Sequence, residues 1–429
     1  MRWAPATATA VAAGVVLCAA LLPGCSRTAP LKIGLMYPTE GSQGVQGNEE
    51  KHGVELAAQW ANAHGGVDGR RVELVTADLD RPESVPSAMA ALARARVAVV
   101  VGTHGSTYSA LAAAEATRRH MLIWETGAVG QVDSAGATTA VGDSPVAAGV
   151  DFIRMAPMGG DLGRNAVDFV SQGLAPQLPH PGPLRWAIAY VDDPYGRAVE
   201  AGAAAEVAAT GQPLVGSFSY RSTGTDFAAL AARIAATHPE ALYVAAYLDD
   251  GTAMRQALAA AHVPLLVNLG TSSSYCMPAF GQRLGTTAVG VFASDKPDAA
   301  AVRPDALTVQ ARTTLTWAAG QYQRQFHGDM TSHALSGFSN AYALFADVLP
   351  AAGQATTDSV AAAAQRVKLP VGSLANGGGL DIAPAGTADA GNNRNAAGVI
   401  WEWVAPGHEA VVWPPAFATH PVVWLPIDQ

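Results

Sequence analysis

Short apolar strands alternate with amphipathic helices along the chain, and this alternation limits the possible fold more than any other feature of the sequence. The run Leu31–Met36 has the length and the branched side chains of a buried strand. A helix over residues 49–64 follows, with acids in its first turn and a Gly-Gly pair as its stop. The next expected elements are strands at 71–76, 97–101 and 121–124 and helices at 83–94 and 108–119. Strands separated by helices form a parallel sheet with right-handed crossovers.

The same pattern starts again after residue 157 and indicates a second lobe. The expected elements are helices at 165–172, 195–209, 227–236 and 252–261 and strands at 186–191, 213–218, 241–247, 265–269 and 289–293. Helices at 310–326 and 333–348 come next, before terminal strands around 399–403 and a Pro-rich end. A chain of this length exceeds one ordinary hydrophobic core, so the sequence predicts an α/β protein with two lobes.

The first residues have the features of an export signal. Arg2 precedes an uncharged apolar run of roughly 14 residues, which is shorter than the ~20 residues needed to cross a bilayer. Residues 22–25 (Leu-Pro-Gly-Cys) are similar to a bacterial lipobox, with Pro23 as a departure. We therefore expect residues 1–24 to be removed and Cys25 to carry a lipid that anchors the chain outside the cytoplasm. The alternative is an ordinary secretory signal and release of a soluble protein.

The composition fits a folded, acidic protein. Apolar residues make up 49% of the chain and charged residues 14%, which argues against disorder. The net charge is −9, and Lys and Arg form no cluster of the kind that binds nucleic acid. Cys276 is the one cysteine in the expected folded part, so no intramolecular disulfide forms and we expect a small buried side chain there.

Five segments together resemble the branched-chain amino acid and amide family of periplasmic binding proteins, in the order of that family. They are Lys32-Ile33-Gly34, residues 65–75 (Gly-Gly-Val-Asp-Gly-Arg-Arg-Val-Glu-Leu-Val), Val100-Val101-Gly102, residues 152–157 (Phe-Ile-Arg-Met-Ala-Pro) and Asp193-Pro194-Tyr195-Gly196. The Gly-Gly-Val-x-Gly-Arg turn is the most specific of these segments. The similarity extends from about residue 31 to about residue 403.

The resemblance implies the type I periplasmic binding protein fold, with two doubly wound parallel-sheet lobes joined by a three-crossover hinge. We expect a first lobe of residues 31–155 plus 295–355 and a second lobe of residues 156–294 plus 356–429. The implied function is capture of a small polar ligand, such as an amino acid, an amide or a related amine, for delivery to an ABC permease. A monomer is expected. The alternatives are a ligand sensor for a membrane receptor or kinase and, more remotely, a hydrolase.

The ligand site is expected at the carboxyl ends of the strands, where loops lead into helices. Ser106 and Thr107 stand where a helix begins, so their hydroxyls and the free backbone N–H groups suit a ligand carboxylate. A plain helix N-cap is the alternative for Ser106. The resemblance implies that Thr126 and the backbone of Ala128 contact the amino-acid backbone of the ligand.

Loops of the second lobe face these residues in the expected fold. They contribute Tyr195, Tyr247, Asp249 and Thr271. Tyr195 matches the Pro-Tyr-Gly position of the family, and a structural aromatic at a helix start is the alternative. The carboxylate of Asp249 suits a ligand ammonium group.

The loop after the strand at 121–124 departs from the family at Trp124 and Glu125, where small neutral residues are usual. Glu125 suits a ligand ammonium and the Trp124 indole suits a cation; the alternative is that Glu125 pairs with an arginine and Trp124 fills the core. Polar or cationic amines, amides and urea-like compounds are therefore candidate ligands on an equal footing with branched-chain amino acids. His104 is either a further ligand contact or an ordinary loop histidine.

The sequence carries none of the common enzyme motifs considered below. The glycines at 41, 44 and 47 do not make G-x-G-x-x-G, and neither 102–106 nor 270–274 reads G-x-S-x-G. His104 has no H-x-x-x-H or C-x-x-C partner, so neither a metal site nor a cofactor is expected. The sequence favours a binding protein over an enzyme.

Overall fold

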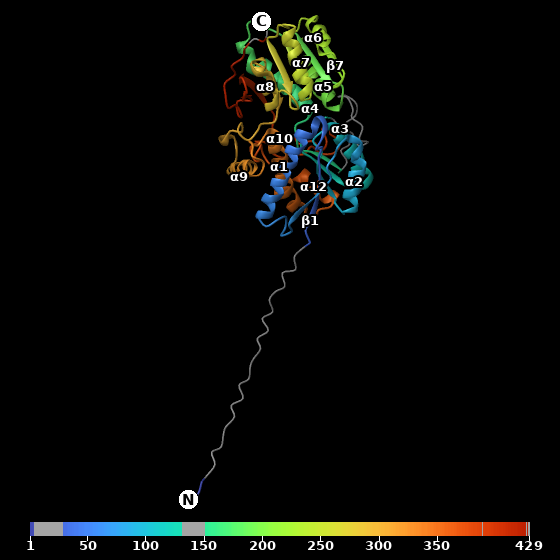
Figure 1. Ribbon diagram of the computed structural model, residues 1–429, viewed down its shortest axis with the longest axis vertical. Coiled ribbons are helices and arrows are strands. Elements are labelled where there is room, and N and C mark those ends of the chain that lie inside the picture. The colour runs from blue at the N-terminus through green and yellow to red at the C-terminus, as the bar shows by residue number, and fades with distance from the viewer. Residues whose placement is uncertain (4–28, 131–150, 388, 426, 428–429) are drawn as a thin grey trace.

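The computed structural model describes residues 1–3, 29–130, 151–387, 389–425 and 427, which form two lobes (Figure 1). The lobes lie end to end along the long axis of the molecule, one mostly blue and orange and the other mostly green and yellow in Figure 1. Each lobe has its own sheet and its own large buried apolar cluster. The predicted α/β architecture of two lobes is confirmed.

The first lobe is built on a five-stranded parallel sheet with the strand order β2-β1-β3-β4-β5. The strands are β1 (Leu31–Met36), β2 (Val72–Thr76), β3 (Val99–Gly102), β4 (Leu122–Glu125) and β5 (Phe152–Arg154). Apolar side chains of β1 and β3 alternate between two buried clusters, one on each face of the sheet. Burial on both faces explains why these strands are near-continuous apolar runs.

Helices cover both faces of this sheet. They are α1 (Gly44–Ala63), α2 (Val85–Arg94), α3 (Ser106–Arg119), α9 (Val309–Phe326), α10 (Ser332–Ala343), α11 (Leu349–Ala352) and α12 (Thr357–Arg366). The backbones of α1 and α10 approach each other closely, since a Cβ on Gly53 would lie 2.0 Å from the Ala334 carbonyl oxygen. A Cβ on Gly337 would likewise lie 2.2 Å from the Glu50 carbonyl oxygen. Glycine at both positions is what permits this packing.

The second lobe is built on a seven-stranded sheet with the order β12-β11-β10-β9-β8-β6-β7. The strands are β6 (Trp186–Val191), β7 (Leu214–Tyr220), β8 (Ala241–Ala245), β9 (Val267–Thr271), β10 (Phe292–Asp295), β11 (Val399–Ala405) and β12 (His408–Trp413). The strands β6 to β10 pair in parallel, whereas β11 and β12 add an antiparallel hairpin at one edge. The C-terminal segment binds this lobe, because Ile427 pairs with Leu265.

The helices of the second lobe alternate with its parallel strands, and α4 precedes the first of them. They are α4 (Gly159–Asp168), α5 (Pro194–Ala209), α6 (Phe227–Ala235), α7 (Leu248–Ala260) and α8 (Pro278–Leu284). Asp193 caps α5 by accepting a hydrogen bond from the Gly196 N–H, and Pro194 occupies the first turn, where no N–H is needed. Short 3-10 or π segments are η1 (Gly41–Gln43), η2 (Pro82–Ser84), η3 (Phe169–Leu174), η4 (Ala175–Gln177), η5 (Gly285–Ala288), η6 (Pro304–Ala306) and η7 (Leu344–Val348).

Arg154 joins two of the places where the chain passes between the lobes. Its Nη1 donates to Asn392 Oδ1 over 3.0 Å, and its backbone bonds to Gly391 and Asn393. Its Nη2 also donates to the Gly130 carbonyl oxygen. Burial lowers the pKa of the Arg154 guanidinium to about 10, and the negative charge of Glu125 opposes this shift, so Arg154 stays charged at neutral pH.

The division of the chain between the lobes differs from the sequence prediction at one place. The prediction assigned residues 356–429 to the second lobe, but α12 lies beside β4 and its apolar face packs in the core of the first lobe. The chain remains in this core as far as Ile382 and returns to the second lobe at β11. The amphipathic pattern of α12 fits either lobe, so the sequence held no signal for this boundary.

Candidate functional site

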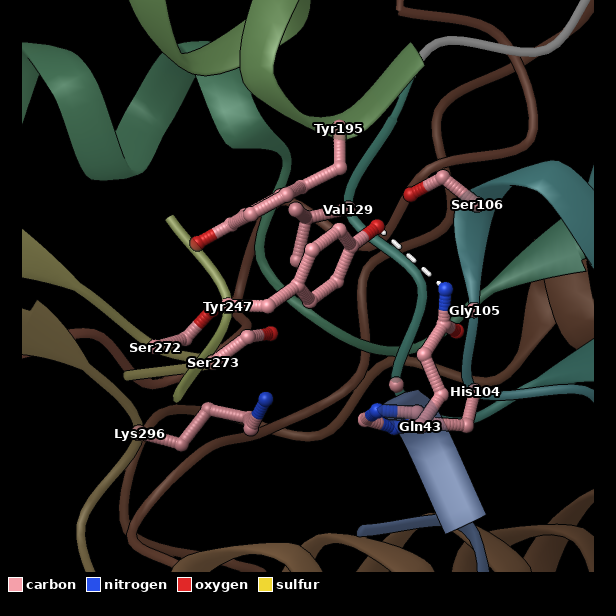
Figure 2. Close-up of a pocket in the computed structure, with 11 residues that line it drawn as sticks. Gln43, His104, Gly105, Ser106, Val129, Tyr195, Tyr247, Ser272, Ser273 and Lys296 are labelled. Carbon is pink, nitrogen blue, oxygen red and sulfur yellow. Dashed lines mark hydrogen bonds between the residues drawn. The ribbon is translucent and has the colours of Figure 1, made fainter. Parts of the chain in front are cut away.

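A pocket lies between the lobes at the carboxyl ends of their strands (Figure 2). It is lined by Gln43, His104, Gly105, Ser106, Gly127, Val129, Tyr195, Tyr247, Ser272, Ser273 and Lys296. The cavity that remains between the two walls is small, with a volume of about 10 Å³. Gln43 Nε2 donates to the Tyr247 hydroxyl over 3.3 Å, so a hydrogen bond from the first lobe reaches the second across this pocket.

Glu125 holds the loops that form the first-lobe wall of the pocket. Its carboxylate oxygens accept hydrogen bonds of 2.5–3.1 Å from the Thr103 N–H and hydroxyl, the His104 N–H, the Ser109 hydroxyl and the N–H groups of Gly127 and Ala128. Burial alone would raise the pKa of Glu125, but these bonds outweigh it and the pKa is lowered. Glu125 is therefore a buried, ionised anchor of two loops.

This placement differs from both sequence-based interpretations of Glu125. The side chain is 0% exposed and is not part of the pocket lining, so it offers no oxygen to a ligand ammonium. It also forms no ion pair with an arginine among the described residues; its partners are N–H and O–H groups. Trp124 does fill the core, as one interpretation held, and its Nε1 donates to the Asn340 carbonyl oxygen over 2.8 Å.

A second buried acid, Glu50 on α1, supports the same wall from behind. His104 Nδ1 lies 2.9 Å from Glu50 Oε1, and the Thr126 hydroxyl donates to Glu50 Oε2 over 2.9 Å. The Thr126 hydroxyl also lies 2.5 Å from the Tyr37 hydroxyl. Thr126 is fully buried and its hydroxyl bonds inside the first lobe, whereas His104 lines the pocket.

Two tyrosines and two serines form the second-lobe wall. The rings of Tyr195 and Tyr247 lie 5.3 Å apart, and the Tyr247 hydroxyl donates to Asp193 Oδ2 over 2.7 Å. Burial raises the pKa values of both phenols well above their usual range, so both remain protonated donors. Ser272 and Ser273 follow β9 at the same edge of the sheet.

Lys296 enters the pocket directly after β10. Its side chain is 3% exposed, and its Nζ lies 3.3 Å from Asp295 Oδ1. The other oxygen of Asp295 accepts a hydrogen bond of 3.0 Å from the thiol of Cys276, which is buried as expected. Burial works against the charge of Lys296, but the carboxylates of Asp295 and Glu50 outweigh it and raise the pKa. Lys296 is therefore an ammonium at neutral pH.

The structure brings four of the predicted contact residues together in the pocket lining, namely His104, Ser106, Tyr195 and Tyr247. The other six are not among the lining residues: Thr107, Glu125, Thr126, Ala128, Asp249 and Thr271. Asp249 is 85% exposed and pairs with Arg283 at 2.6 Å, and Thr271 is fully buried with its hydroxyl on the Ser294 carbonyl oxygen. These six residues do not line the pocket in this structure, and ligand contact by them stays a prediction.

Sequence reasoning missed several residues of the lining. They are Gln43, Gly105, Gly127, Val129, Ser272, Ser273 and Lys296. A signal for Lys296 was present, since a lysine that follows a buried strand lies at the carboxyl edge of a parallel sheet. The expected strand at 289–293 ended too early, because β10 runs to Asp295.

Two doubly wound lobes that share a pocket between their strand ends define a two-lobed solute-binding protein. The chain belongs to the periplasmic binding protein family, whose model matches residues 30–393. It is 25% identical over 380 residues to the Leu/Ile/Val-binding protein homolog 8 of Brucella abortus, a match that covers 87% of this chain and 89% of the relative. A second relative, Leu/Ile/Val-binding protein homolog 7 of Brucella suis, is 26% identical over 242 residues, 56% of this chain and 58% of the relative.

Solved structures share the fold at lower identity. An extracellular ligand-binding receptor from Rhodopseudomonas palustris HaA2 has a TM-score of 0.72 at 14% identity, covering 90% of this chain and 100% of its own. LivJ from Streptococcus pneumoniae in complex with isoleucine has a TM-score of 0.67 at 18% identity, covering 90% and 100%. A solute-binding protein from R. palustris in complex with benzoate has a TM-score of 0.68 at 16% identity, covering 93% and 99%. These matches confirm the predicted type I fold.

The predicted signal segment, residues 1–24, and the predicted lipid site, Cys25, lie almost entirely outside the described residues, which begin again at residue 29. Across the helices that the structure describes, none combines the length and the apolar character needed to cross a bilayer. The family is one of periplasmic, that is extracytoplasmic, binding proteins.

Proposed function

We propose that this protein is the substrate-capture component of an ABC importer and that its ligand is a small organic molecule bound between the lobes. The observation that carries the proposal is a pocket whose walls come from both lobes, at the strand ends where ligands of open α/β sheets bind. The relatives named as Leu/Ile/Val-binding proteins and the neighbours solved with isoleucine or benzoate support a small carboxylate as the ligand.

Closure of the lobes on the ligand is part of the proposal. Two hydrogen bonds already span the cleft, from Gln43 to Tyr247 and from Gln46 Nε2 to the Met277 sulfur at 3.2 Å. A ligand that touches both walls adds contacts that an open arrangement lacks, and this difference in affinity shifts the population toward the closed state. The closed form then docks on a permease, which releases the ligand unchanged.

Thermal stability with a panel of compounds tests the proposal. Amino acids, amides, short carboxylates and amines are added to the purified protein, and a compound that binds the native state raises its Tm. Small-angle scattering with the best compound is expected to give a smaller radius of gyration. If no compound of any class raised the Tm, or if binding left the radius unchanged in an open protein, capture by closure would be wrong.

A pair of serine variants places the binding in the pocket. Ser106→Ala removes a hydroxyl from the lining and is expected to weaken binding about fivefold, because a hydrogen bond is worth roughly 1 kcal/mol. Ser87→Ala makes the same change at an exposed site on α2 and is expected to leave affinity unchanged. Calorimetry compares the two, and equal effects would argue against the pocket.

Transport, the lack of catalysis and lipid anchoring need separate tests. Mass spectrometry of the released compound is expected to show the same mass before and after incubation, and a changed mass would indicate an enzyme. Cells that lack the protein are expected to lose uptake of the compound identified above, whereas intact uptake with loss of a transcriptional response would favour a sensor.

The sequence at residues 22–25 supports a lipid on Cys25, so Cys25→Ser is expected to move the protein from the membrane fraction to the soluble one.

A further inference from the structure

The pocket lining carries a positive charge and no negative charge among the described residues. Among the lining residues that the structure describes, Lys296 is the one permanently charged side chain, and no Asp or Glu is present. Figure 2 shows the Lys296 ammonium directed into the space that Ser273, Tyr247 and Gln43 surround. An ammonium has three N–H donors, and within the described part of the chain the structure gives this one a single close partner, Asp295 at 3.3 Å.

The acids nearest the pocket are not among its lining residues. Glu50 is bonded to His104 and Thr126, and Glu125 is bonded to the loop N–H and O–H groups described above. Asp193 accepts from the Tyr247 hydroxyl and from the Gly196 N–H. Asp295 accepts from the Cys276 thiol through Oδ2, while its Oδ1 has no hydrogen-bond partner among the described residues and lies 3.3 Å from Lys296 Nζ. A ligand ammonium in the pocket would therefore meet Lys296 and no carboxylate of the lining.

The neutral groups of the lining favour the same kind of ligand. Ser106 lines the pocket and begins α3, whose N-terminus has no side-chain cap, and its hydroxyl accepts a hydrogen bond of 2.9 Å from the Gly130 N–H. The one lining side-chain oxygen that is buried without a hydrogen-bond partner is Gln43 Oε1, among the described residues. Gln43 Oε1 can accept from a ligand hydroxyl, and the hydroxyls of Ser272 and Ser273 can donate to a ligand carboxylate.

We propose that the ligand is a small carboxylate that carries no ammonium group, and that Lys296 is the residue that selects it by binding its anionic end. This inference rests on the proposed function as a solute-binding protein. A 2-oxo acid, a 2-hydroxy acid or an aromatic acid satisfies the pocket, whereas an amino acid brings a positive charge next to a buried lysine. Like charges in a site of low polarity repel, and neither can move into water while the lobes are closed.

Matched pairs of ligands test the proposal on the unmodified protein. The pairs are pyruvate with alanine, 4-methyl-2-oxopentanoate with leucine, and phenylpyruvate with phenylalanine, so that each pair differs in the ammonium group alone among charges. Calorimetry at neutral pH is expected to show at least tenfold tighter binding of the oxo acid in every pair that binds. An amino acid that binds as tightly as its oxo acid would overturn the proposal.

Charge-removing variants test the role of Lys296. Lys296→Met combined with Asp295→Asn removes both members of the buried pair, so that no unpaired charge remains inside the protein. We expect affinity for the best oxo acid to fall about 10- to 100-fold, because bonds to charged groups are stronger than neutral ones. Lys32→Met, at an exposed position of β1, is the control and is expected to change nothing. A folded double variant with unchanged affinity would show that Lys296 does not hold the anion.

The outcomes separate this inference from the proposed function. If an amino acid or an amine binds in the cleft and no oxo acid does, the protein is a solute-binding protein and the role of Lys296 is refuted. If the wide panel yields no ligand of any class, the proposed function fails and the inference fails with it. If the double variant does not fold, the comparison of matched pairs still decides the ligand class.

Discussion

The two walls of the pocket are held in shape by different chemistry. The first-lobe wall consists of loops whose N–H groups converge on the buried carboxylates of Glu125 and Glu50. The second-lobe wall contains two tyrosines whose hydroxyls donate to Asp193 and to the Ala246 carbonyl oxygen. In the first wall the acid is the centre and the loops depend on it, whereas in the second the ring packing remains if a hydroxyl is lost. We therefore expect the first wall to govern stability and the second wall to govern ligand affinity.

The largest expected effect comes from Glu125→Gln. The amide would replace one acceptor oxygen by an NH₂ group that faces N–H donors of the loops, and buried donors would lose their partner. We expect the free energy of unfolding in urea to fall by about 3 kcal/mol. Glu73→Gln on the exposed side of β2 is the control and is expected to change it by less than about 0.5 kcal/mol. A loss below 1 kcal/mol for Glu125→Gln would contradict the difference between the walls.

The second expected effect is a pH dependence of opposite sign at two acids that support the walls, Glu125 for the first and Asp250, which accepts from the Tyr247 N–H, for the second. Burial raises the pKa of Asp250 to about 6 from its usual value of 3.8, so the folded state holds its proton to a higher pH than the unfolded state does. The stability from this group is complete below pH 3.8 and is lost as the pH rises through 6. The pKa of Glu125 is lowered, so its contribution is present above pH 4.5 and is lost on acidification.

Urea unfolding measured from pH 7 down to about pH 3 tests both trends, because the loss from Glu125 occurs below pH 4.5. Asp250→Asn is expected to remove a decline of about 2 kcal/mol between pH 4 and 6, because a carboxamide does not titrate but keeps the acceptor for Tyr220. Glu125→Gln is expected to remove the loss of stability that the wild type shows on acidification below pH 4.5. The interpretation would be wrong if Asp250→Asn and the wild type had parallel profiles.

A third, smaller effect separates affinity from stability within the second lobe. Tyr247→Phe removes the hydroxyl that lines the pocket and meets both Asp193 and Gln43, and we expect ligand affinity to fall about tenfold. Tyr220→Phe removes a similarly buried hydroxyl that donates to Asp250 but lies outside the lining, and we expect affinity to stay the same. Calorimetry compares the ligand affinities of the two variants, and equal losses of affinity would show that the Tyr247 hydroxyl has no special role in binding.

The smallest effect is expected at Asp249, a residue that the sequence placed at the ligand. Asp249→Asn breaks an exposed pair with Arg283, and such pairs contribute roughly 0–1 kcal/mol. We expect unchanged ligand affinity and a shift in unfolding free energy below about 0.5 kcal/mol. A clear loss of affinity would return Asp249 to the site and change the assignment of the second wall.

The fold could be predicted because its signals are local and repeated. Apolar runs such as Leu31–Met36 and the amphipathic helices between them recur through both lobes, and their alternation leaves few topologies. The site could be predicted only as far as its loops. Ser106 and Tyr195 reach the pocket from the loops where they were expected, because strand ends fix where loops lie.

The direction of a side chain within a loop could not be predicted. Glu125 and Thr126 are in the expected loop, but both point into the first lobe, where Glu125 accepts from donors such as the Thr103 N–H and Thr126 donates to Glu50. Lys296 was missed because its direction depends on tertiary packing. It follows Asp295 at the end of β10, and the packing of β10 decides that the lysine side chain lies in the pocket lining. Such choices are made by tertiary contacts, which a one-dimensional pattern does not contain.

The burial of Cys276 makes the molecule a convenient starting point for a fluorescent reporter. Its thiol donates to Ser272 and Asp295, and burial raises its pKa well above the usual value, so it reacts slowly with maleimides while the protein is folded. In a version expressed without residues 1–25, no other native thiol competes for the dye. A cysteine introduced at the rim of the cleft would then carry a single label, and its emission would report the position of the lobes in real time.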